Sequence, residues 1–138
     1  MAEAVILDSE AVYALAQPKQ RAVLAARARD ILRVALEHRA LIRVPAAVLG
    51  EVCRGPRFDA AIDHLLNGRG IGVADLTRTI AQRAGALLSE ARLSSEHAVD
   101  AFVAATALDY ETSIVMTGDP GDINRLLARH PHVHVLGI

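Results

Sequence analysis

Short runs of apolar residues alternate along the chain with longer segments whose apolar residues recur every three or four positions. The runs are nearly free of polar residues, and they lie at 4–7, 41–44, within 70–76, at 113–117 and at 133–136. Strands of this kind are covered by other elements on both faces, which is typical of parallel sheets. The pattern therefore predicts an α/β protein with a mostly parallel sheet.

The segments between these runs predict helices with recognisable ends. Gln17 and Pro18 end the first helix, Pro45 opens the third, and Gly55 with Pro56 closes it. The predicted helices cover 9–16, 21–37, 45–53, 57–66, 77–91, 94 or 95 to about 110, and 120–129. No repeat or linker interrupts them, so we expect a single domain over residues 1–138.

One predicted helix carries a carboxylate among apolar residues. If Ser94 or Ser95 caps this helix, Asp100 lies past its first turn, where the helix dipole does little for a charge. The helix is apolar nearly all round, so we expect it to be buried on more than one side. A carboxylate in such surroundings requires an arginine or a metal ion.

The composition narrows the class of protein. Hydrophobic residues form 52% and charged residues 22% of the 138, which is a globular balance and not a disordered one. The net charge of −1 argues against a uniformly basic nucleic-acid binder. Lys19 is the only lysine, and we attribute the excess of arginine to codon composition ahead of phosphate recognition.

The single cysteine, Cys53, excludes an intramolecular disulfide and a cysteine-cluster zinc site. The first residues, MAEAVILD, lack the basic region of a signal peptide, and no segment reaches the roughly 20 apolar residues of a membrane span. We therefore expect a cytoplasmic protein.

Acidic residues follow several of the predicted strands. Asp8 comes directly after the first strand, Asp119 follows 113–117 by one residue, and Glu51 lies in the helix after the second strand. In an open parallel sheet, ligands gather at the carboxyl ends of the strands, so these acids and Asp100 could meet there. Each acid also has an ordinary explanation: helix capping for Asp8 and for Asp119, and pairing with Arg54 for Glu51.

Carboxylates brought together repel one another, and a divalent cation removes the conflict. Oxygen ligands suit Mg²⁺ or Mn²⁺, and such an ion can activate water and stabilise a phosphoryl oxygen. An acid-only pocket thus favours phosphodiester hydrolysis over zinc chemistry.

Four segments in order carry a resemblance to a known family. VILDSEAVYAL, VPAAVLGEV, HAVDAFVAATAL and SIVMTGDPGDINRL make the chain similar to the PIN domain family, and within it to the VapC-like toxins of toxin–antitoxin modules. The resemblance implies a three-layer α/β/α sandwich on a mostly parallel sheet of four to five strands. It also implies a ribonuclease that uses Mg²⁺ or Mn²⁺.

Carried over residue by residue, the resemblance makes Asp8, Glu51, Asp100 and Asp119 the catalytic acids and metal ligands. Ser9 and Thr117 match the hydroxyl residues beside the first and last acids, and Asp122 matches a secondary ligand or a helix cap. The implied partners are an RNA substrate, a second copy of the chain, and a cognate antitoxin whose tail fills the acidic groove. The apolar helix around Asp100 agrees with a homodimer. A few arginines could hold RNA phosphates: Arg54, Arg57, Arg69 and Arg92.

Rival interpretations fit less well. A receiver-type phosphoacceptor needs a lysine at the site, and a haloacid-dehalogenase-type phosphatase needs an aspartate where Glu10 stands. The serious alternative is a non-catalytic PIN-like binding module whose acids grip an arginine of a partner. The histidines are scattered, and none of them, His97 near Asp100 included, receives a role.

Overall fold

The sheet has five parallel strands in the order β3-β2-β1-β4-β5. The computed structural model describes residues 2–68 and 70–138. The strands are β1 (Ala4–Leu7), β2 (Leu41–Pro45), β3 (Ile71–Ala74), β4 (Ser113–Thr117) and β5 (Val133–Gly137). The predicted parallel α/β fold is confirmed, with every predicted strand in place.

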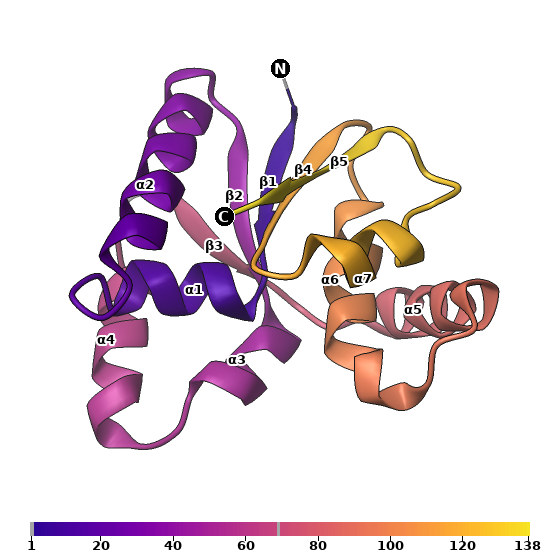
Figure 1. The fold of residues 1–138 in the computed structure, drawn as a ribbon, viewed down its shortest axis with the longest axis horizontal. Helices are drawn as coiled ribbons and strands as arrows, with labels where there is room; N and C mark the ends of the chain where they lie inside the picture. The colour runs from indigo at the N-terminus through magenta and orange to yellow at the C-terminus, as the bar shows by residue number, and fades with distance from the viewer. Residues whose placement is uncertain (1, 69) are drawn as a thin grey trace.

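Helices cover both faces of the sheet (Figure 1). One side carries α1 (Ser9–Ala16), α2 (Ala22–Glu37) and α4 (Pro56–Leu66), and the other carries α5 (Arg78–Ala91), α6 (Ala98–Ala107) and α7 (Pro120–Leu126). The short α3 (Ala46–Val52) lies beyond the carboxyl ends of the strands. Within the two described ranges, no helix is long and apolar enough to cross a membrane.

The central strand β1 fixes where the strand ends meet. All four of its residues are buried, and it pairs with β2 on one side and with β4 on the other. The chain runs from β1 outward to β2 and β3, then returns to the other side for β4 and β5, so the strand order reverses between β1 and β4. Ligands of open parallel sheets bind at such a reversal. Asp8 lies there, with its backbone N–H donating to the Met116 carbonyl at 3.1 Å.

The start of α6 differs from the prediction. A 3₁₀ turn (Ser95–His97) precedes the helix, and the Ser94 side chain forms no capping hydrogen bond. Asp100 consequently lies in the first turn of α6, so the prediction that it lies beyond that turn is wrong. The helix dipole in the first turn favours an ionised carboxylate.

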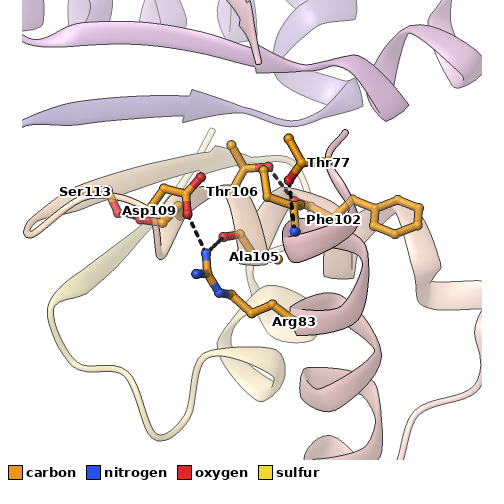
Figure 2. Close-up of polar contacts among 9 residues, drawn as sticks. Thr77, Arg83, Phe102, Ala105, Thr106, Asp109 and Ser113 are labelled. Atoms are coloured by element: carbon orange, nitrogen blue, oxygen red, sulfur yellow. Dashed lines mark hydrogen bonds and ion pairs between the residues drawn. The ribbon is translucent and has the colours of Figure 1, made fainter. Parts of the chain in front are cut away.

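The apolar surroundings of α6 are supplied by the chain itself. Six of its ten residues are buried, and α5 packs along the side that faces away from the sheet (Figure 1). Arg83 of α5 joins the two helices: its guanidinium donates to the Ala105 carbonyl at 3.2 Å and to the Asp109 carboxylate at 2.6 Å (Figure 2). The burial of α6 therefore requires no second copy of the chain, contrary to the expectation above.

We predict that Arg83→Met lowers the free energy of unfolding by about 1–2 kcal/mol, because it removes an ion pair and a hydrogen bond to a carbonyl near the end of α6. Methionine keeps the helix propensity and much of the apolar stem. The matched control is Arg33→Met, which breaks the exposed pair of Arg33 with Glu37 and should cost about 0.5 kcal/mol or less. Urea denaturation measures both, and equal losses would contradict the role given to Arg83.

Candidate metal centre

Asp8 is held by backbone groups from two segments. Its carboxylate accepts from the Ala11 N–H at 2.9 Å, which caps α1, and from the Gly118 N–H at 3.2 Å, which follows β4. The residue is only 5% exposed. Burial raises the pKa of Asp8 above its ordinary value, although these N–H groups and the Thr117 hydroxyl oppose the change. Asp8 is therefore a helix cap, as the ordinary explanation holds, and also a fixed acid at the strand reversal.

Thr117 links the first and the last acid of the predicted set. Its side chain is fully buried, its hydroxyl contacts the Asp8 carboxylate, and its oxygen accepts from the Asp119 N–H at 2.9 Å. Gly118 lies so close to α1 that a Cβ there would come within 2.6 Å of the Glu10 side chain. The glycine thus permits the loop after β4 to approach Asp8.

Glu51 reaches the same end of the sheet from α3. The Ser9 hydroxyl donates to its carboxylate, and the Tyr13 hydroxyl donates to its backbone carbonyl at 3.2 Å. Arg54 also donates to that carbonyl, at 3.1 Å. The ordinary explanation of Glu51, pairing of its carboxylate with Arg54, therefore does not hold.

The pKa of Asp100 responds to the charges of the other predicted acids. Its pKa is raised to about 6, first by burial and then by the negative charges of Asp8, Asp122, Glu51 and Asp119. These effects outweigh the helix dipole, which favours the ionised form in the first turn. The structure therefore brings the four predicted acids and Asp122 near one another, and we call this group of five side chains the acidic pocket.

Two of these acids, Asp119 and Asp122, lie at the start of α7. Asp119 precedes α7, yet its side chain makes no capping hydrogen bond, so the ordinary explanation of Asp119 as a cap fails. Asp122 follows in the first turn, half-buried. Ligand atoms of Asp122, Asp100 and His97 lie within 4.8 Å of one another, whereas Asp8, Glu51 and Asp119 lie outside this compact group.

Among the residues that the structure describes, no arginine forms an ion pair with an acid of the acidic pocket, and the cation-capable side chain nearest to Asp122 is His97, at 3.5 Å. Among the described residues, the ion pairs formed by arginine join Glu10, Glu37 and Asp109, and none of these acids belongs to the pocket. Several carboxylates without a paired arginine fit an oxygen-preferring divalent ion such as Mg²⁺ or Mn²⁺. The donor set is thus compatible with a metal ion.

Two residues near the acidic pocket were not predicted from the sequence to have a role. His97 lies with Asp100 and Asp122, and Arg21 pairs with Glu10 and stacks 5.7 Å from the Tyr13 ring. The position of His97 depends on the unpredicted 3₁₀ turn, and its three-residue spacing from Asp100 was the available signal. Of the arginines expected to flank the groove, Arg54 contacts Glu51, Arg57 and Arg92 are exposed, and Arg69 lies outside the described residues.

The chain is thus an α/β protein whose parallel sheet carries a group of acids at the strand reversal, and this group is compatible with a metal ion. The chain belongs to the PIN domain family, whose model matches residues 5–126. No curated protein matches the chain by sequence.

Two solved structures show the same fold. One is VapBC2 from Rickettsia felis bound to a DNA fragment from its promoter, with a TM-score of 0.71 and 14% identity over 98% of each chain. The other is a toxin–antitoxin complex from Klebsiella pneumoniae, with a TM-score of 0.63 and 20% identity over 97% of this chain and 99% of that one.

We predict that Asp100→Asn stabilises the metal-free protein at pH 7. Folding raises the pKa of Asp100, so between about pH 4 and pH 6 the folded state holds a proton that the unfolded chain releases, and the free energy of unfolding falls as the pH rises. The variant should gain about 1–2 kcal/mol at pH 7, less than the full shift implies because water screens the pocket, and nothing below about pH 3.5.

Urea denaturation in EDTA at pH 3.5 and pH 7 measures this difference. Asp30→Asn, at an exposed position on α2, is the control and should differ from the wild type by no more than about 0.5 kcal/mol at either pH. An Asp100→Asn variant less stable than the wild type at pH 7 would show that the carboxylate is not under the electrostatic strain described.

Proposed function

We propose that the chain is a Mg²⁺- or Mn²⁺-dependent endoribonuclease and the toxin of a type II toxin–antitoxin pair. The observation that carries the proposal is the acidic pocket: five carboxylates at the strand reversal with no arginine of the described chain to balance them. Membership of the PIN domain family and the shared fold with two toxin–antitoxin structures support it.

The residues of the acidic pocket and its neighbours would have two roles, binding the ion and orienting its ligands. Asp8, Glu51, Asp100 and Asp119 would hold the ion, with Asp122 as a supporting ligand. A bound divalent ion lowers the pKa of water and stabilises a phosphoryl oxygen during in-line attack. Ser9 orients the Glu51 carboxylate, and Thr117 holds the Asp8 carboxylate in register with Asp119. Burial and the neighbouring acids raise the pKa of Asp100, and a divalent ion held there would favour its ionised form.

The proposed partners follow from the charge of the pocket. An RNA phosphodiester would approach the ion, and exposed arginines such as Arg54 would contact its phosphates. A cognate antitoxin would block the pocket with a basic tail that replaces the ion's charge. A homodimer of single-domain chains, residues 1–138, stays part of the proposal and now rests on the family likeness alone, because α5 covers α6.

We predict that the metal-loaded protein cleaves RNA and that Asp100→Asn, Glu51→Gln or Asp119→Asn lowers the rate by about 100-fold or more, since losing even a residue that orients a ligand costs 10–100-fold in metal sites. The assay uses short end-labelled RNAs and total RNA, with EDTA, Mg²⁺ or Mn²⁺. Asp30→Asn is the control and should cleave like the wild type.

The chemical groups at the ends of the RNA products distinguish the proposed activity from that of contaminating nucleases. Attack by metal-activated water leaves ordinary phosphate and hydroxyl ends, whereas attack by the RNA 2′-hydroxyl leaves a 2′,3′-cyclic phosphate. Cyclic ends, or equal cleavage by the acidic-pocket variants, would contradict the proposal. Intact RNA together with tight binding of an arginine-containing partner segment would favour the non-catalytic binding module.

A further inference from the structure

We propose that His97 is a nitrogen ligand of the metal centre, so that the pocket binds Mn²⁺, or another first-row transition ion, in preference to Mg²⁺. The inference rests on the proposed metal-dependent function and adds a ligand that the acid set does not include. The site it defines consists of His97, Asp100 and Asp122, which we call the nitrogen subsite.

Distances in the nitrogen subsite suit a shared ion better than a hydrogen bond. His97 Nδ1 lies 3.5 Å from Asp122 Oδ2, beyond the roughly 2.7–3.2 Å of an N–H···O hydrogen bond. Ligands about 2.1 Å from an octahedral ion are about 3.0 Å apart when adjacent and about 4.2 Å apart when opposite. The three ligand atoms all lie within 4.8 Å of one another, which is close to this range.

The backbone brings the three groups to one place. The 3₁₀ turn ends at His97, which has φ −96° and ψ 16° and is the N-cap residue of α6. Asp100 lies three residues later, and residues at this spacing share a helix face. Asp122 comes from the first turn of α7, which packs against α6. Two helix starts therefore supply one nitrogen and two carboxylates.

A carboxylate also faces the other nitrogen of the ring. His97 Nε2 lies 3.4 Å from Glu96 Oε1, on the opposite edge of the imidazole from Asp122. Histidines that bind metal commonly donate their second N–H to a carboxylate, which fixes the ring and makes the ligating nitrogen more basic. The His97 side chain is 24% exposed, so it remains reachable from solvent.

The nitrogen ligand determines which ion is preferred. Mg²⁺ favours oxygen ligands, whereas imidazole suits first-row transition ions, whose affinity rises along the series from Mn²⁺ to Cu²⁺. An acid-only pocket would discriminate little between Mg²⁺ and Mn²⁺. With His97 as a ligand, Mn²⁺ gains a contact that Mg²⁺ uses poorly.

The test is electron paramagnetic resonance of the protein loaded with Mn²⁺. Binding removes the signal of free aqueous Mn²⁺, and spin-echo modulation detects a directly bound ¹⁴N. We expect nitrogen modulation in the wild type and its loss in His97→Gln, with Mn²⁺ affinity reduced about 10–100-fold and Mg²⁺ affinity, measured by competition, nearly unchanged. The control is His132→Gln, an exposed histidine before β5 that should behave like the wild type.

A second variant protects the test against misfolding of His97→Gln. Glu96 is 77% exposed, so Glu96→Gln should fold normally, keep the nitrogen modulation and lower Mn²⁺ affinity by up to about 10-fold. Bound Mn²⁺ without nitrogen modulation in the wild type would overturn the inference and leave the nuclease proposal standing. Nitrogen modulation without RNA cleavage would overturn the nuclease proposal alone, and absence of Mn²⁺ binding would overturn both.

Discussion

The main constraint on the structure is the mutual repulsion of carboxylates that the fold gathers at one edge of the sheet. Asp8 and Asp119 follow strands, Glu51 and Asp100 lie on helices, and the fold places them near enough that the charges of the other acids add to burial in raising the pKa of Asp100. A chain under no other constraint would separate these charges or pair them with arginine. The arginines of the described chain that form ion pairs do so elsewhere. A bound divalent ion would compensate this negative charge and so account for the gathering of the acids.

Rigid local structure keeps the acids together against this repulsion. Backbone N–H groups hold both oxygens of Asp8, and the buried Thr117 joins it to Asp119. Small residues allow the segments to approach one another: a side chain at Gly118 would collide with Glu10, and the alanines of α6 pack against the strands and α5. Cohesion of the core thus offsets a local electrostatic cost, and the cost is concentrated where the ligand would bind.

The strands and the acids that directly follow them could be predicted because their signals are local. Apolar runs fix the strands, and an acid directly after a run must lie at the carboxyl edge of a parallel sheet. The 3₁₀ turn before α6 and the contact of Arg83 with Ala105 could not be predicted, because they depend on how α5 and α6 pack. His97 was missed for the same reason. The metal and catalytic roles of Asp8, Glu51, Asp100 and Asp119 stay predictions.

The most direct measurement is carboxyl ¹³C NMR of the Asp100 side chain during a pH titration, with and without Mg²⁺. The account predicts a midpoint at about 6 in the metal-free protein, a lower midpoint in Asp8→Asn, and a fall of more than about two pH units when Mg²⁺ binds. A midpoint near 4 in the metal-free protein, unchanged by Asp8→Asn and by Mg²⁺, would contradict it, because the carboxylates would then not share a pocket.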